Sequence, residues 1–385
     1  MTDEPLVERM RGFGTTIFAE MSALAVATQS INLGQGFPDT DGPPDLLDAA
    51  CAAIRNGRNQ YPPGPGIPEL RAAIAAHQRL HYGLNFDPDT EILVTAGATE
   101  AIAASIMGIA GPGDEVIVFE PYYDSYSACI ALGGAQRRAV TLERDGQGWG
   151  FDPAALRAAI SPRTKAILVN TPHNPTGKVY TPTELQTIAE LAIEHDLIVI
   201  ADEVYEHLTF DEHLHVPIAT LPGMRERTIT ISSAGKTFSV TGWKIGWICA
   251  PPHLLSAART VKQFLTYVSG GPFQYAVAGQ LGGDVSAVAK TLAAQRDLLC
   301  AGLTDLGFDV VVPQATYFAT VDLGAGAGGT DAVAFCRELP QRARVVAIPS
   351  QVFYDSHAGD RYVRFAFCKR PEVLSDALDR MQALR

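Results

Sequence analysis

The sequence predicts an α/β fold with a large, mostly parallel sheet and a smaller α+β lobe towards the C-terminus. From about residue 90, short β-branched runs alternate with amphipathic stretches, and this rhythm changes near residue 283. Strands that alternate with helices form parallel sheets covered on both faces. The length of 385 residues also suits two lobes better than one.

Six segments of the large lobe carry the apolar pattern of buried strands. They are residues 92–95, 116–119, 166–170, 197–201, 228–231 and 245–249. Two helix starts lie between them. Thr181 begins a capping box with Glu184 and has proline at the first helical position, and Asp152 precedes Pro153 in the same way.

The smaller lobe begins with a helix over about 286–306, which ends before Gly307. Strands near 309–312, 317–322, 344–348 and 362–367 and helices near 331–338 and 371–384 follow. We predict an N-terminal segment, 1–43, that packs with the small lobe. The large domain then spans 44–283 and the small domain 284–385.

Composition excludes several classes of protein. The formal net charge of −12 opposes binding to a nucleic-acid backbone. Charges, glycines and prolines interrupt every apolar run before it reaches about 18 residues, so we expect no membrane span. The acidic start does not resemble a secretory signal, and six scattered cysteines without a CxxC pair are typical of the cytoplasm.

Histidines and glycines provide weaker motifs. His77 and His81 are spaced as two metal ligands on one helix, but HQRLH lacks the glutamate of a zincin and no third ligand is evident. We therefore expect a solvated helix face and no metal, and a polar loop around His213 and His215. The GAGAGG run at 324–329 is interpreted as a flexible loop.

Chemistry-bearing motifs follow several of the predicted strands. TAGATE begins at Thr95, NPTG at Asn174, ADEVY at Ala201 and SSAGK at Ser232. Open α/β sheets bind ligands at the carboxyl ends of their strands, so we expect these segments to meet in one site.

The order GAT, EPYYDSY, NTPHNPTG, DEVY, SSAGKTFSVTGWKIGW and RFAF resembles the pyridoxal 5'-phosphate (PLP) aminotransferases of class I/II, which have fold type I. INLGQGFPD and NQYPPGPGIPELR extend the resemblance over nearly the whole chain. The sequence is similar to the kynurenine/glutamine transaminase branch. Through EMSALA, NQYPPGPG and TISSA it is more similar still to actinobacterial N-succinyldiaminopimelate aminotransferases.

The resemblance implies a catalytic role for Lys236, one of only seven lysines. It would bind the PLP aldehyde and then act as general base and acid. Asp202 would keep the pyridine nitrogen protonated, and Tyr205 and Asn174 would donate to the phenolic oxygen of the ring. Tyr123 would stack on the ring, although Tyr122 is the alternative.

The resemblance also implies a phosphate site and a homodimer. Ala98 and Thr99 at a helix start, together with Ser233 and Lys244, would hold the phosphate. Tyr61 would reach the phosphate of the neighbouring subunit, so that the active site is shared.

For the substrate, the resemblance implies that Arg364, Gly36 and Asn174 bind the α-carboxylate. Phe18 matches an N-terminal aromatic of the kynurenine branch. Gly270 and Gly271 stand where relatives carry larger side chains, which suggests a roomy pocket for a long or aromatic side chain.

These observations predict an enzyme that transfers an amino group from N-succinyl-LL-2,6-diaminopimelate, or another long or aromatic amino acid, to 2-oxoglutarate or a similar 2-oxo acid. The alternative is a kynurenine/glutamine-type enzyme with β-lyase activity on cysteine conjugates. Two other readings are weaker. A non-catalytic regulator would need a basic DNA-binding domain, and a serine hydrolase built on Ser233 and Lys236 lacks its partner motifs.

Overall fold

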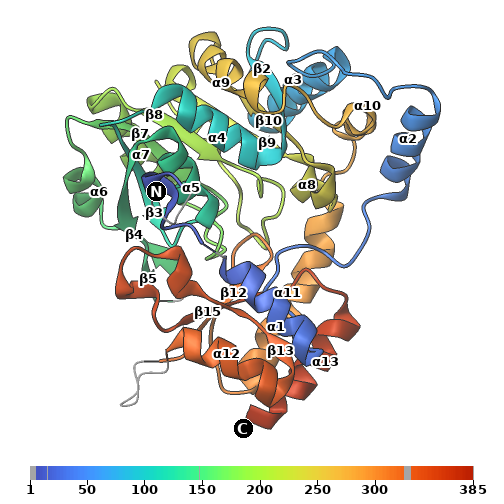
Figure 1. Ribbon diagram of the computed structural model, residues 1–385, viewed down its shortest axis with the longest axis vertical. Helices are drawn as coiled ribbons and strands as arrows, with labels where there is room; N and C mark the ends of the chain where they lie inside the picture. The colour runs from blue at the N-terminus through green and yellow to red at the C-terminus, as the bar shows by residue number, and fades with distance from the viewer. Residues whose placement is uncertain (1–5, 15, 147, 325–330, 385) are drawn as a thin grey trace.

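The computed structural model describes residues 6–14, 16–146, 148–324 and 331–384. Figure 1 shows a large lobe above a smaller one, with the N-terminal helix α1 (Ile17–Thr28) beside the lower lobe. Most of the GAGAGG run lies outside the described residues. The predicted α/β class with a second α+β lobe is confirmed.

A seven-stranded sheet forms the centre of the large lobe. Its order is β2-β10-β9-β8-β7-β3-β4. The strands are β2 (Ile92–Ala96), β3 (Glu115–Glu120), β4 (Gln136–Thr141), β7 (Thr164–Asn170), β8 (Ile198–Asp202), β9 (Thr228–Ser233) and β10 (Ile245–Cys249). Only β10 runs antiparallel to its neighbours in this sheet.

All six predicted strands of the large lobe are present, and the analysis missed β4. This edge strand has the sequence QRRAVT, and its first three residues are exposed, so it lacks the apolar run of a buried strand. A short hairpin of β5 (Glu143–Asp145) and β6 (Gly148–Gly150) follows it.

Helices cover both faces of this sheet because its strands are buried on both sides. Val116 and Val118 of β3 belong to one cluster, and Ile117 and Phe119 belong to the opposite one. The helices are α4 (Gly97–Ile109), α5 (Asp124–Gly133) and α9 (Pro252–Leu265) on the first face, and α6 (Pro153–Ala159) and α7 (Pro182–Glu194) on the second. Asp152 caps α6, and the predicted capping box of Thr181 and Glu184 begins α7.

A third helical group packs against the β2–β10 end of the sheet. It comprises α2 (Pro44–Arg55), α3 (Pro68–Tyr82) and α10 (Gly271–Gln280). The prediction that His77 and His81 lie on a solvated face of α3 is wrong for His77, which is only 2% exposed. His215 lies in the expected loop, but its side chain is also buried, against Glu203.

The small lobe contains an antiparallel sheet of order β11-β12-β15-β14. Its strands are β11 (Asp309–Val311), β12 (Phe318–Asp322), β14 (Ile348–Pro349) and β15 (Tyr362–Ala366), and its helices are α11 (Ala287–Asp305), α12 (Ala332–Ala343) and α13 (Pro371–Met381). The predicted strand 344–348 is divided, since β13 (Val345–Val346) pairs elsewhere.

The N-terminal segment contacts the small lobe. Strand β1 (Ile31–Asn32) pairs in parallel with β13, and Met21 of α1 joins the buried cluster of that lobe. The exact domain boundaries remain predictions.

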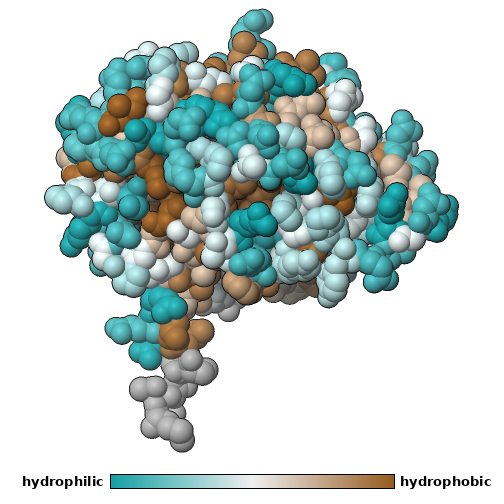
Figure 2. Space-filling model, turned by 90° about the horizontal axis from the view of Figure 1, so that it is seen from above, coloured by the Kyte–Doolittle hydropathy of each residue, from teal (hydrophilic) through white to brown (hydrophobic). Residues whose placement is uncertain are grey.

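No helix within the described residues combines the length and apolar character needed to cross a membrane. Figure 2 shows hydrophilic residues spread over the face seen from above, with smaller apolar areas between them.

Candidate active site

One cavity of about 350 Å³ collects nearly all the predicted site residues. It lies at the ends of the strands of the large sheet and is closed by β12 and β15 of the small lobe. Every residue predicted above to contact the cofactor or the α-carboxylate lines it, and so does Phe18, but Tyr61 does not. The chain therefore brings twelve of the thirteen predicted residues together from segments spread over both lobes.

Lys236 lies in the short helix α8 (Ala234–Thr237), directly after β9. Its Nζ donates to the hydroxyl of Tyr317 at 2.7 Å. Burial lowers the pKa of Lys236 to about 8, and the positive charges of Lys244 and Arg364 act in the same direction. A larger fraction of this amine is consequently neutral and nucleophilic near neutral pH than for an ordinary lysine.

Asp202 ends β8 and is only 4% exposed. Its Oδ2 accepts a hydrogen bond from the hydroxyl of Tyr126 at 2.5 Å. Burial raises the pKa of Asp202 to about 6, although the bond from Tyr126 opposes this shift. A cationic group beside this carboxylate would offset the burial and hold it ionised. Tyr126 lies within the EPYYDSY motif but was not predicted as a site residue.

Further tyrosines lie near the Asp202 carboxylate. Tyr205 lies in the turn after β8 and is buried, and burial raises the pKa of its hydroxyl. The structure distinguishes the two adjacent tyrosines. Tyr123 faces the cavity, whereas the hydroxyl of Tyr122 donates to Asp355 at 2.7 Å outside it.

The first turn of α4 lines the end of the cavity that suits an anionic ligand. Gly97 adopts a φ of +73°, and Ala98 and Thr99 follow it into the cavity. A Cβ on Gly246 of β10 would approach the carbonyl carbon of Gly97 to 2.5 Å, so only glycine permits this strand to lie against the helix start. The free N–H groups and positive dipole of a helix start favour an anion, and Ser233 and Lys244 line the same cavity.

Arg364 of β15 is a buried cation with unused donors. Its Nη1 donates to Oδ1 of Asn174 at 3.1 Å and its Nη2 donates to the carbonyl of Gly34 at 3.0 Å. Its Nε is buried and has no hydrogen-bond partner within the described residues. Burial lowers the pKa of Arg364 to about 10, so the guanidinium stays charged at neutral pH. A carboxylate ligand would match this charge.

Aromatic rings surround Arg364 and narrow the cavity. The guanidinium carbon lies 3.9 Å from the ring centre of Phe318 and 5.3 Å from that of Phe18. Tyr317, which the sequence analysis missed, bridges two elements because its hydroxyl also donates to the carbonyl of Gly36 at 2.6 Å. A Cβ on Gly36 would approach the Phe318 ring to 2.5 Å, so only glycine fits at this position.

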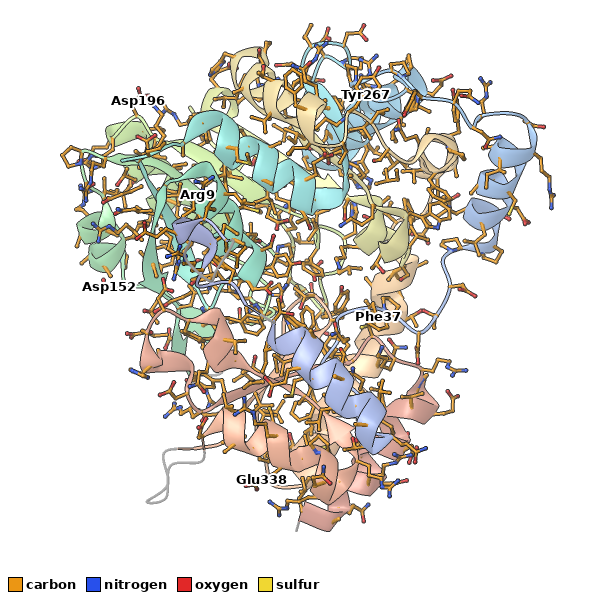
Figure 3. The ribbon with its side chains drawn as sticks, viewed as in Figure 1. Arg9, Phe37, Asp152, Asp196, Tyr267 and Glu338 are labelled. Carbon is orange, nitrogen blue, oxygen red and sulfur yellow. The ribbon has the colours of Figure 1, made fainter. Side chains whose placement is uncertain are left out.

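Tyr61 lies apart from this cavity. It is 83% exposed and lines a second hollow together with Gly270 and Gly271. These glycines do not line the main cavity of their own chain, and the expectation that they widen the substrate pocket stays a prediction. Gly270 is required by a left-handed turn before α10, where its φ is +63°. Figure 3 shows Tyr267, beside Tyr61, high on the large lobe and Phe37 lower, between the lobes.

Comparison with known proteins agrees with this geometry. The family described as aminotransferase class I and II matches residues 28–381. The solved structure of N-succinyldiaminopimelate aminotransferase from Mycobacterium tuberculosis is 52% identical, covers 99% of this chain and 100% of its own, and has a TM-score of 0.96.

Two further relatives belong to other branches. An Escherichia coli methionine aminotransferase structure is 38% identical over 98% of this chain and 100% of its own, with a TM-score of 0.93. Kynurenine–oxoglutarate transaminase 3 of Mus musculus is 39% identical over 96% of this chain and 88% of its own length. The chain belongs to the class I and II aminotransferases.

Proposed function

We propose that this aminotransferase uses PLP to move an amino group from N-succinyl-LL-2,6-diaminopimelate to 2-oxoglutarate. The observation that carries the cofactor assignment is the complementary set of groups in one cavity. The buried lysine amine, whose pKa is lowered, suits an aldehyde, and the buried carboxylate suits a pyridinium. The helix start, with an added cation, suits a phosphate.

The residues of the chain divide the work as follows. When bound, PLP supplies a carbonyl that takes up the amino group and a ring that accepts electrons from the α-carbon. Asp202 would hold a proton at the ring nitrogen, and Tyr126 would fix the orientation of that carboxylate. Tyr205 and Asn174 would donate to the ring oxygen, and Tyr123 would pack against the ring. The phosphate would be held by Ala98, Thr99, Ser233 and Lys244.

Lys236 would act as the base that removes the proton from the α-carbon of the amino donor and as the acid that returns it. Its Nζ lies 2.7 Å from the hydroxyl of Tyr317, which orients the amine within the cavity. Arg364, with Asn174 and the backbone of Gly36, binds the α-carboxylate of the donor. The unpartnered Nε of Arg364 and its neutral oxygen partners support this role.

The choice of donor rests on the relative with 52% identity, whose structure is described as an N-succinyldiaminopimelate aminotransferase. The second candidate is kynurenine or a cysteine conjugate, and one observation favours it. Phe18 and Phe318 flank the guanidinium that would hold the donor, and an aromatic side chain could stack on them.

We also propose a cytoplasmic homodimer in which Tyr61 completes the phosphate site of the partner. Exposure of Tyr61 on the rim of the second hollow supports a contact with another copy. The six free cysteines agree with a reducing compartment.

The test has two parts on separate samples: a donor screen of the untreated enzyme with 2-oxoglutarate as acceptor, and borohydride treatment followed by peptide mapping. We expect a bound chromophore that is trapped on Lys236, and the highest kcat/KM with N-succinyl-LL-2,6-diaminopimelate. A label on another lysine would contradict the catalytic assignment. Preference for kynurenine would select the second donor, and preference for aspartate would contradict both donors.

A further inference from the structure

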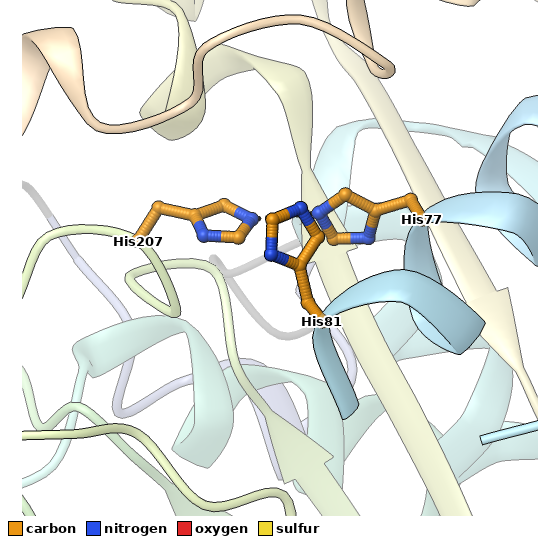
Figure 4. A group of neighbouring side chains, drawn as sticks. All are labelled: His77, His81 and His207. Carbon is orange, nitrogen blue, oxygen red and sulfur yellow. Dashed lines mark hydrogen bonds between the residues drawn. The ribbon is translucent and has the colours of Figure 1, made fainter. Parts of the chain in front are cut away.

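Three histidines meet on the side of the Tyr205 turn that faces away from the active-site cavity. His77 and His81 lie one turn apart on α3, and His207 belongs to the turn that follows β8 (Figure 4). One nitrogen from each imidazole lies within 4.8 Å of the others. The structure thus supplies the third imidazole that the sequence did not reveal. We call these three residues the histidine cluster.

Two nitrogens of the histidine cluster are closer than two unprotonated nitrogens can be. Nε2 of His77 lies 2.7 Å from Nε2 of His207. One of the two nitrogens must therefore carry a proton that it donates to the lone pair of the other, and a bound metal would replace this shared proton. Nδ1 of His77 has no hydrogen-bond partner within the described residues, so no neighbour fixes the proton of this ring at one nitrogen.

Carboxylates add negative charge around the cluster. Glu206 is buried, and its Oε2 lies 3.9 Å from Nε2 of His207. The adjacent Glu203 accepts from Nε2 of His215 at 3.1 Å. Imidazoles set beside buried carboxylates favour a bound cation.

We propose that the histidine cluster binds one transition-metal dication of the Zn²⁺, Co²⁺ or Ni²⁺ class. Imidazole nitrogen is a preferred ligand for these ions, whereas Mg²⁺ and Ca²⁺ prefer oxygen. His77 and His207 are pre-positioned by packing, and exposed His81 has the freedom to close the site. His81 also gives the ion a route from solvent.

Binding at this site would cross-link two distant parts of the large lobe. The ion would join α3 to the turn that carries Tyr205 into the catalytic cavity. Because the native chain gathers these three ligands and the unfolded chain does not, metal would stabilise the fold. The site shares no residue with the catalytic cavity, so its occupancy is separable from the proposed transamination.

The experiment uses PLP-loaded enzyme without a polyhistidine tag, and Zn²⁺, Co²⁺ and Mg²⁺ as separate probes. Equilibrium dialysis with elemental analysis counts bound metal, and thermal unfolding measures Tm across a metal titration. His81→Ala is the main variant because this residue is exposed and its loss leaves no buried cavity. His357→Ala removes a histidine that is 96% exposed far from the cluster and serves as the matched control. Cys51→Ser tests the exposed thiol as a competing ligand.

We expect about one Zn²⁺ or Co²⁺ per chain, no retained Mg²⁺, and a Tm that rises with the concentration of the transition metal. His81→Ala should lose at least tenfold in affinity and most of the Tm shift, with an unchanged circular-dichroism spectrum. His357→Ala and Cys51→Ser should keep both. Absence of stoichiometric binding to the parent enzyme, or equal binding by His81→Ala, would overturn the proposal.

Discussion

The two sides of the turn after β8 differ in how their charges are satisfied. On the cavity side, Asp202 and Tyr205 face a space where burial raises the pKa of the carboxylate to about 6. On the opposite side, burial also raises the pKa of Glu206, but His207, His77 and a hydrogen bond from Ser232 bring it down to about 2. The pKa values of Asp202 and Glu206, which are only four positions apart, are thus shifted in opposite directions.

The cavity therefore contains groups that a ligand can satisfy, whereas the groups of the histidine cluster are paired with one another. In the cavity, the donors of Arg364 and the carboxylate of Asp202 are incompletely matched by the chain, so a zwitterionic ligand would satisfy them. In the histidine cluster the chain supplies its own partners, and a metal would replace a shared proton. Variants in the cavity should therefore change transamination, and variants in the histidine cluster should change metal binding.

Lys236→Ala should give the largest effect. The substitution removes the nucleophilic amine and the proton carrier together, so we expect transamination to fall by about 10⁴-fold or more. Single-turnover kinetics of the PLP-loaded variant would measure the loss. Zn²⁺ binding at the histidine cluster should remain. Loss of this binding would contradict the claim that the cluster and the catalytic cavity are independent.

Arg364→Ala should have the next largest effect. Two charge-assisted hydrogen bonds to the donor carboxylate are worth about 1.5–3 kcal/mol each, so kcat/KM should fall by about 100-fold or more for every amino donor. Arg364→Lys keeps the charge without the forked geometry and should recover only part of the loss. A loss restricted to one donor would contradict a role at the α-carboxylate that all donors share.

The lowered pKa of Lys236 predicts how pH affects reconstitution of the apoenzyme with PLP. Only the neutral amine attacks the aldehyde, so the rate should fall about tenfold for each pH unit below the pKa. With a pKa of about 8, the rate should reach its plateau just above pH 8. Stopped-flow absorbance would follow the bound chromophore. A rate that still rises steeply above pH 9 would show that burial does not lower this pKa.

Tyr317→Phe should produce the smallest change. It removes one neutral acceptor from Lys236 and one bond to the backbone of Gly36, worth about 0.5–1.5 kcal/mol each. We expect a reduction in kcat of about three- to tenfold. Loss of an acceptor for the ammonium should also move the reconstitution midpoint to lower pH. An unchanged midpoint would limit Tyr317 to a packing role.

Much of the fold follows from local sequence patterns. The six buried strands of the large sheet were predicted because continuous apolar runs between capped helices are a strong local signal. Strand β4 was missed because its exposed arginines hide the pattern. The split between β13 and β14 depends on pairing with β1, which lies more than 300 residues earlier and leaves no local signal.

The sequence by itself predicted the catalytic set, because the motifs around Lys236, Asp202 and Arg364 resemble those of the class I and II aminotransferases. Several of the motifs also follow strands, whose ends converge. The sequence could not determine which of Tyr122 and Tyr123 enters the cavity, or that Tyr126 and Tyr317 support the two central charges. Only tertiary structure decided that His207 meets His77 and His81, and that Gly270 lies outside the main cavity. Contacts between residues far apart in the chain depend on how helices and strands pack, and packing is a property of the whole chain rather than of any local pattern.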